Sequence, residues 1–396
     1  MSIPRKSISK IPAFRLTKAF RSFYESKSSI GIILIIATIL ALIIANSSWY
    51  EHYHHLLELP LPIHAEFINL DFNLEMWIND GLMAIFFLLV GLEIKRELVV
   101  GELSTIKKAS LPISAAIGGM LVPALFYTLF NYGNPSQSGW GIPMATDIAF
   151  AIGILSLAGN KIPVSLKVFL TALAVVDDLG AILVIAIFYT QSLQMGFLVA
   201  ALAILGLMFL LNYFDVNVMA VYLILGVIVW YFIFQSGIHA TISGVLVAFT
   251  IPFKKRLEKS ILHKLEHIIV NPVNFIIIPL FAFANTGIHL TGSIFDIVQS
   301  DIFKGIGLGL FLGKPIGILG ASILSVRAGL SSLPADVKAR HLLGAGFLGG
   351  IGFTMSIFIS MLAFKNPEFI DVAKVSVLIT STVAGIIGFV ILKRVS

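Results

Sequence analysis

Apolar stretches, each about long enough to cross a lipid bilayer, follow one another along most of this chain. Of its 396 residues, 58% are apolar and 12% are charged, whereas soluble domains usually contain roughly 25% charged residues. A soluble protein could not cover so many apolar side chains, and a transmembrane helix needs about 20 mainly apolar residues. The sequence therefore predicts an all-α membrane protein that crosses the bilayer many times.

Twelve transmembrane helices are expected, and an even number places both termini on the same side of the membrane. A basic tail over 1–28 precedes a single transmembrane domain over 29–396. Most of the 27 Lys and Arg residues fall in the tail and in alternate loops, which predicts that these segments are cytoplasmic. This bias accounts for the net charge of +6 without nucleic acid binding. The expected spans lie near residues 29–48, 78–98, 109–131, 142–158, 163–188, 194–213, 218–235, 239–252, 262–287, 304–326, 341–363 and 371–392.

Four charged residues interrupt the apolar stretches: Asp147, Asp177, Asp178 and Lys314. A charged side chain at the centre of a bilayer costs at least a few kcal/mol, so such residues usually mark the path of an ion or a proton. Lys314 is the natural countercharge for the carboxylates. We expect it to form an ion pair with one of the two adjacent aspartates, and Asp177 is the first choice.

The adjacent pair Asp177 and Asp178 is the expected site of ion binding. On a helix the two side chains project about 100° apart, so one can face an ion cavity while the other faces a neighbouring helix. Adjacent carboxylates in a low dielectric resist double ionisation. The pair should therefore hold protons near neutral pH until a cation displaces them. Carboxylate oxygens suit small hard cations, which here means Na⁺ or Li⁺.

Two expected spans are interrupted by residues that weaken helices. In the fourth, Pro143 and two glycines precede Thr146 and Asp147, and in the eleventh five glycines precede Thr354. Interrupted segments at corresponding positions in two halves of a transporter are a pointer to its binding site. Spans 3–5 and 10–12 would then be inverted repeats with discontinuous helices 4 and 11. Asp147 could compensate positive helix ends or act only as an N-cap, and the glycines could simply permit close packing.

A long acidic segment near residues 50–72 joins the first two spans on the external side. Its apolar residues alternate weakly, which suggests a short β-hairpin whose edge could pair with a second copy of the chain. An irregular loop fits the pattern equally well.

Charged residues also gather at the cytoplasmic ends of the second and ninth spans. Glu93, Arg96 and Glu97 end the former, and Glu266 and His267 open the latter. Histidine titrates in the physiological range, so a joint cluster could sense pH. Charges at helix ends are more often solvated anchors, and the pattern alone favours that interpretation.

At these residues the chain resembles the NhaA family of bacterial sodium/proton antiporters. The matching segments run in order along the whole apolar part of the chain: WINDG at 77–81, FFLLVGLE at 86–93, ATDIAF at 145–150, DDLGA at 177–181, PLFAFAN at 279–285, GKP at 313–315 and GIGFTMSIF at 350–358.

The resemblance implies a twelve-helix fold with crossed, partly unwound fourth and eleventh helices, and a homodimer assembled partly through the external hairpin. It implies that Asp177 and Asp178 bind Na⁺ or Li⁺ and protons, and that Lys314 pairs with Asp177. Thr146 and Asp147 would support the helix crossing and the ion site. It also raises pH sensing by Glu93, Arg96, Glu97, Glu266 and His267 above simple anchoring. One departure is Val270, where a second histidine is expected one turn beyond His267, so the activation pH would differ from that of relatives.

The expected function is electrogenic Na⁺(Li⁺)/H⁺ antiport by alternating access in the bacterial inner membrane, which would serve Na⁺ and pH homeostasis. Na⁺, H⁺ and the lipid bilayer are the expected partners, and no cofactor is expected. A cation channel is a first alternative, but a lone central site between broken helices favours a carrier. An intramembrane aspartyl protease using Asp147 and Asp178 is a second, and Lys314 in the same site counts against it.

Overall fold

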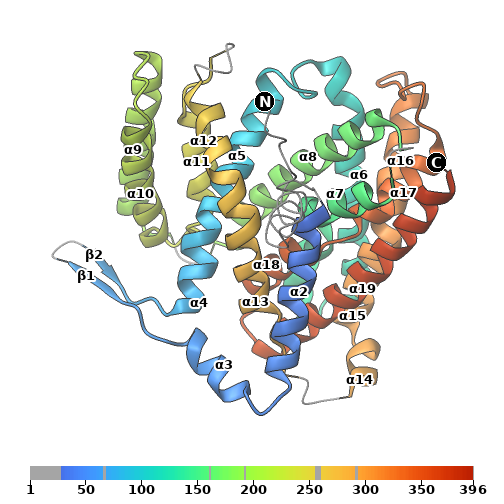
Figure 1. Cartoon of the computed structure of the whole chain (residues 1–396), viewed down its shortest axis with the longest axis horizontal. Helices are drawn as coiled ribbons and strands as arrows, with labels where there is room; N and C mark the ends of the chain where they lie inside the picture. Colours follow the sequence, from blue (N-terminus) through green and yellow to red (C-terminus); the bar gives the residue numbers. More distant parts are fainter. Residues whose placement is uncertain are drawn as a thin grey trace, which may run out of the picture.

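Most of the chain is helical in the computed structural model, which describes residues 28–65, 68–159, 162–190, 193–254, 260–289 and 293–395 (Figure 1). The expected basic tail lies, apart from Ser28, outside the described residues. The first half contains α2 (Ser28–Ala45), α3 (Tyr50–Leu57), α4 (Leu74–Met76), η2 (Trp77–Leu82), α5 (Met83–Val99), α6 (Ile106–Asn131), η3 (Gln137–Met144), α7 (Ile148–Leu157), α8 (Val164–Phe188), α9 (Met195–Tyr213) and α10 (Met219–Gln235). The second half contains α11 (Ile242–Thr250), α12 (Ile261–Pro272), η5 (Val273–Ile277), α13 (Ile278–Thr286), α14 (Ile294–Gln299), α15 (Asp301–Leu308), η6 (Gly309–Gly313), α16 (Lys314–Arg327), α17 (Ala339–Gly349), α18 (Phe353–Ala363) and α19 (Pro367–Val395).

Eight helical segments in the described part of the chain are long and apolar enough to cross a membrane, and counting each of two bent pairs as one span raises the number to ten. The remaining two expected spans coincide with α10, which has 17 residues, and α11, which has nine. Large apolar side chains point outward, such as Leu129 at 77% exposure and Ile187 at 69%. Apolar surface of this extent fits contact with lipid. The chain is thus a multi-pass membrane protein.

Two of the apolar segments lose their helical form where proline and glycine interrupt them. The 3₁₀ helix η3 contains Pro143 and is followed by extended residues before α7 begins at Ile148. Residues 350–352 separate α17 from α18, and the two helices are bent by 47°. The two breaks lie against each other, because the backbone N–H of Asp147 donates to the carbonyl oxygen of Ile351 at 2.7 Å.

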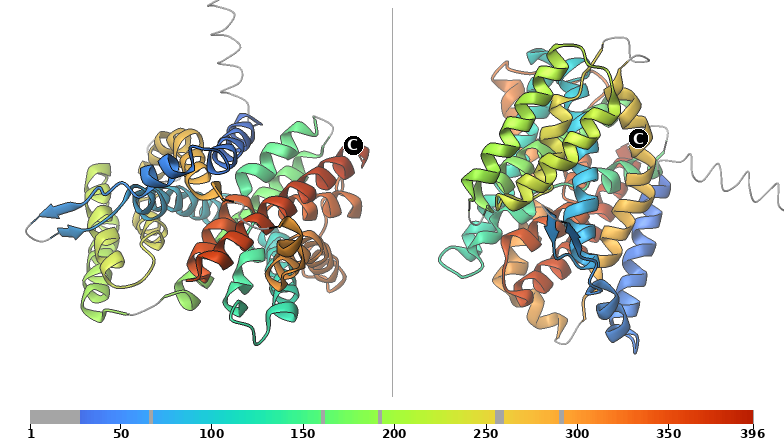
Figure 2. Two further views of the ribbon diagram at one scale, coloured as in Figure 1. Left: turned by 90° about the horizontal axis from the view of Figure 1, so that it is seen from below. Right: turned by 90° about the vertical axis from the view of Figure 1, so that its left-hand side faces the viewer.

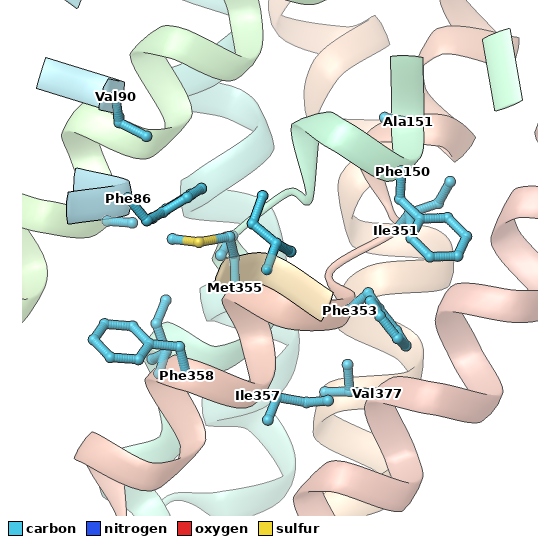
Figure 3. Close-up of a cluster of buried hydrophobic side chains, with 14 of the residues drawn as sticks. Phe86, Val90, Phe150, Ala151, Ile351, Phe353, Met355, Ile357, Phe358 and Val377 are labelled. Carbon is cyan, nitrogen blue, oxygen red and sulfur yellow. The ribbon is translucent and has the colours of Figure 1, made fainter. Parts of the chain in front are cut away.

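Aromatic and aliphatic side chains surround this crossing (Figure 3). Phe150 of α7 packs on Phe353 of α18 with ring centroids 4.9 Å apart. Phe358, further along α18, contacts Phe87 of α5 at 5.5 Å between centroids. Because the crossing lies in an apolar core, its free backbone N–H and C=O groups must find partners within the protein.

Helices α6 and α16 approach each other through glycine. A Cβ atom added to Gly118 would lie 2.2 Å from the carbonyl oxygen of Gly317, and one added to Gly317 would lie 2.1 Å from the carbonyl oxygen of Gly118. Only a residue without a side chain allows two backbones to come this close. The contact fixes α16, and with it Lys314, the first residue of that helix.

In the described part of the chain, three spans contain a π-helical turn: η2 leads into α5, η5 lies between α12 and α13, and η6 lies between α15 and α16. A π turn accommodates one additional residue in an α-helix and is frequent at functional sites. Here η6 ends at Gly313, directly before Lys314.

The segment between α2 and α4 forms the expected hairpin, preceded by a helix that the sequence did not reveal. Strands β1 (Ile63–Ala65) and β2 (Ile68–Leu70) pair antiparallel, with Ile63 opposite Leu70, and project from the helical body (Figures 1 and 2). Helix α3 packs back on α13, because the Tyr53 hydroxyl donates to the carbonyl oxygens of Phe283 and Ala284 at 2.6 and 3.1 Å.

Candidate ion site between two broken helices

Asp147 joins the starts of two helices with a single carboxylate. Its Oδ1 accepts from the backbone N–H of Phe150 at 3.0 Å, in the first turn of α7. Its Oδ2 accepts from the backbone N–H of Thr354 at 3.2 Å and from the Thr354 hydroxyl at 2.5 Å, in the first turn of α18. Helix starts carry unpaired N–H groups and a partial positive charge. The side chain, 2% exposed, therefore caps both helices and compensates their positive ends.

Ser381 of α19 completes the start of α18. Its Oγ accepts from the backbone N–H groups of Gly352 and Phe353, both at 3.2 Å. Neither this serine nor Thr354 was singled out by sequence, because hydroxyl groups cost little in an apolar helix and leave no anomaly to notice. The signal that the sequence did offer was the run of glycines before Thr354, because a helix that starts after such a break has free N–H groups that need acceptors.

Lys314 lies fully buried beside Asp177. Its Nζ is 2.5 Å from Asp177 Oδ2 and 2.9 Å from the Thr146 hydroxyl oxygen. The Thr146 hydroxyl donates in turn to the carbonyl oxygen of Gly349 at 2.7 Å, at the C-terminal end of α17. Thr146 thus links the ammonium group to the negative end of a broken helix. The pairing expected from sequence, Lys314 with Asp177, is the one observed.

Asp178 faces the same region from the next position of α8 and is 3% exposed. Its Oδ1 and the Oδ1 of Asp177 are buried and have no hydrogen-bond partner among the described residues. The charges of Asp177, Glu93, Asp147 and Lys314 all act on Asp178. A buried polar oxygen without a partner is uncommon in native proteins and calls for an explanation.

A balance of charges shows what could occupy this place. The two helix starts compensate Asp147, and Lys314 compensates Asp177, which leaves the carboxylate of Asp178 without a matched cation. Two unit charges about 4 Å apart interact by roughly 4 kcal/mol near a protein surface, so one monovalent cation or one proton would be held here. Within the described ranges, no cluster of three or more His, Asp or Glu residues could hold a resident metal ion.

Comparison with known proteins identifies the family. The family described as Na⁺/H⁺ antiporter 1 matches this chain over residues 21–392. The chain belongs to this Na⁺/H⁺ antiporter family. It is 54% identical to Na⁺/H⁺ antiporter NhaA 1 of Flavobacterium johnsoniae over 381 residues, which cover 96% of this chain and 98% of the relative. It is 49% identical to the NhaA antiporter of Cytophaga hutchinsonii over 379 residues, 96% of each chain.

Membership of the antiporter family confirms the resemblance seen in the sequence, and it disfavours the channel and protease alternatives. The relatives are transporters by name. In this family member, the buried pair on α8 and the crossing of α7 and α18 form one continuous polar centre inside an apolar core.

A second polar centre lies where α5 meets α12. Arg96 forms an ion pair with Glu266 and contacts Glu97 Oε1 at 3.3 Å. The histidine nearest to Glu266 is His263, whose Nδ1 is 4.0 Å from Glu266 Oε2, whereas His267 lies on the exposed side of α12. Among the described residues, neither His263 Nδ1 nor Glu266 Oε2 has a hydrogen-bond partner.

Glu93 of α5 precedes Arg96 by three residues and is linked to both polar centres through its charge alone. It interacts electrostatically with Arg96, Glu266 and Glu97, and its charge also acts on Asp178. Of the five residues that the sequence analysis grouped as a pH-sensing cluster, four interact through their charges: Glu93, Arg96, Glu97 and Glu266. The fifth, His267, is exposed on the outer side of α12.

Proposed function

We propose that the chain exchanges Na⁺ for H⁺ by alternating access, with Asp177 and Asp178 as the site that both ions share. The observation that carries the proposal is the pair of buried carboxylate oxygens without protein partners, one on each aspartate. Na⁺ or Li⁺ would bind these oxygens when protons leave, and protons would return when the cation is released. No cofactor is needed for this exchange.

The neighbouring residues have separate parts in the mechanism. Lys314 holds one oxygen of Asp177 and keeps the pair from binding two cations. Thr146 orients the ammonium group, and Asp147 keeps the two broken helices together beside the site. Two titrating groups that exchange with one Na⁺ move a net charge, so transport is electrogenic. Each charge is worth about 2.3 kcal/mol per 100 mV, and the proton gradient would drive Na⁺ out of the cell for Na⁺ and pH homeostasis.

The membrane topology belongs to the same proposal. We infer twelve spans in the bacterial inner membrane, with both termini cytoplasmic, formed by residues 29–396. Counting α10 and α11 as spans alongside the ten longer segments gives this number. Inverted repeats over spans 3–5 and 10–12 are supported by the breaks before α7 and α18, which meet at Asp147 as the discontinuous helices of such repeats would.

Two further properties are proposed on local geometry. Glu93, Arg96, Glu97 and Glu266 would sense pH, with His263 in the inner position and His267 as an outer member, because Glu93 connects this cluster electrostatically to Asp178. A homodimer would form through the hairpin, whose strand edges project away from the helices (Figure 2).

The exchange reaction can be tested in proteoliposomes. Addition of Na⁺ to vesicles loaded at acid pH should move protons outward in strict exchange. Asp178→Asn should abolish this exchange, and Lys304→Gln, an exposed lysine in α15, is the matched control that should leave it intact. Proton movement of native size in Asp178→Asn would refute the site. Current without proton movement would indicate a channel.

A further inference from the structure

A pocket outside the ion site lies at the end of the molecule where α6 and α8 begin. Its volume is about 620 Å³, and its walls come from the first turns of α6, from α8 and from the chain after α16. Lys107 and Lys108 stand at its polar rim, and Val164 and Val168 form part of its apolar wall. The pocket is therefore positively charged at one side and apolar at the other.

The apolar wall is open to the surroundings. Val164 is 73% exposed and Val168 is 40% exposed. Behind them, Phe169 and Leu111 close the floor with 5% and 6% exposure. These exposed valines give the pocket wall an apolar outer surface, which suits an acyl chain.

The rim is built to attract an anion. Helices α6 and α8 both start here, neither has a side-chain N-cap, and neither has an acidic residue in its first turn. Helix starts favour negative charge, and Lys107 and Lys108 add two positive charges in the first turn of α6. Two acids lie close to the pocket. Glu102 Oε1 is 3.6 Å from Lys108 Nζ, with its side chain 41% exposed, and Asp336 Oδ1 accepts from the hydroxyl of the pocket-lining Ser165 at 2.6 Å. Glu102 neutralises one lysine only in part and Asp336 offsets the start of α8, so the positive charge of the rim is concentrated at the start of α6.

We propose that this pocket binds an anionic phospholipid, with the phosphate at Lys107 and Lys108 and an acyl chain along Val164 and Val168. Basic pockets between transmembrane helices bind anionic head groups in other membrane proteins. An entrance for Na⁺ is the competing use, but two lysines at the mouth would repel a cation. The lipid would touch α8, the helix that carries Asp177 and Asp178.

The proposal can be tested on the purified full-length chain by native mass spectrometry, with phosphatidylglycerol and phosphatidylcholine of the same acyl chains. The native chain should retain the anionic lipid preferentially. Lys107→Gln combined with Lys108→Gln should weaken retention by about 25-fold, since each lysine near a membrane surface contributes about fivefold. Lys393→Gln, an exposed lysine near the end of α19, is the matched control. Glu102→Gln should retain the lipid at least as tightly as the native chain.

Three results would overturn the proposal. The first is an equal loss of lipid in the double variant and in Lys393→Gln. The second is displacement of the lipid by glycerol phosphate at an equal concentration, which would indicate a site for a free anion. The third is attachment of a photoreactive phosphatidylglycerol elsewhere than at the beginnings of α6 and α8, located by peptide mapping.

Discussion

Replacing Lys314 with methionine removes the ammonium group while keeping an unbranched apolar side chain of similar length. In the native structure Lys314 and Asp177 are both fully buried, and Nζ lies 2.5 Å from Oδ2. After Lys314→Met, Asp177 would remain as a buried carboxylate without a partner. Removing one member of a buried ion pair costs about 3–5 kcal/mol, whereas removing both costs far less.

The expected size of the effect can be stated as a melting temperature. For a large chain, about 2 °C is lost per kcal/mol, so Lys314→Met should lower Tm by roughly 6–10 °C. Asp177→Asn should also destabilise, because it leaves Lys314 without its anion. The double variant should melt at least about 4 °C higher than the sum of the two single effects predicts, which corresponds to roughly 2 kcal/mol of coupling.

Thermal unfolding in detergent at pH 8, followed by tryptophan fluorescence at one heating rate, would measure all four proteins. Lys304→Met is the control: this lysine pairs with Asp301 at 3.1 Å, but both side chains are more than 40% exposed, and an exposed pair contributes up to about 1 kcal/mol. A Tm of Lys314→Met within 1 °C of the native value, or purely additive effects in the double variant, would refute the reasoning.

Asp147→Ala should cost about 2 kcal/mol, roughly 1 for each helix start that loses its cap; a Tm no lower than that of Ser293→Ala, which uncaps the short helix α14, would contradict the double capping. Gly317→Val should prevent assembly of α6 with α16 and sharply reduce the yield of folded protein on gel filtration. Gly320→Val is its control in the same helix, because an added Cβ there meets no atom within 4 Å. His263→Gln should shift the pH profile of transport in proteoliposomes more than His267→Gln, because His263 lies beside Glu266. A larger shift in His267→Gln would show that His267, and not His263, is the histidine that acts with Glu266.

The charged residues of the candidate ion site could be singled out from sequence because each is an energetic anomaly. Asp147, Asp177, Asp178 and Lys314 stand in apolar runs where an ionised side chain needs a reason. Thr354 and Ser381, which complete the crossing, gave no such signal. Their hydroxyl groups are compatible with any transmembrane helix, and only the fold brings them to the starts of α7 and α18.

Helical phase explains the histidine at the second polar centre. Residues three apart share a face of an α-helix, whereas neighbours in sequence lie about 100° apart. Glu266 turns inward, so His263 accompanies it and His267 turns outward. The sequence analysis named His267 as the histidine of the cluster, and the structure places His263 beside Glu266 instead; which of the two takes part in pH sensing stays a prediction.

The boundaries of most expected spans agree with the helices within a few residues, since long apolar runs are strong signals. Helix α3 was missed because it has only eight residues and is rich in histidine, so its apolar face consists of little more than Tyr53 and Leu57. The span expected over 239–252 was already short, and the helix found there, α11, has nine residues.

The extra residue in η6 determines where Lys314 points. Each residue of an α-helix advances the side-chain direction by about 100°, and a π turn holds one residue more than the regular turn it replaces. Without that insertion, the same lysine in an otherwise straight helix would be aimed away from α8 by about a quarter of a revolution. The ammonium group that serves Asp177 is thus steered by backbone winding on the preceding turn, and a deletion among apolar residues that never touch an ion would be enough to misdirect it.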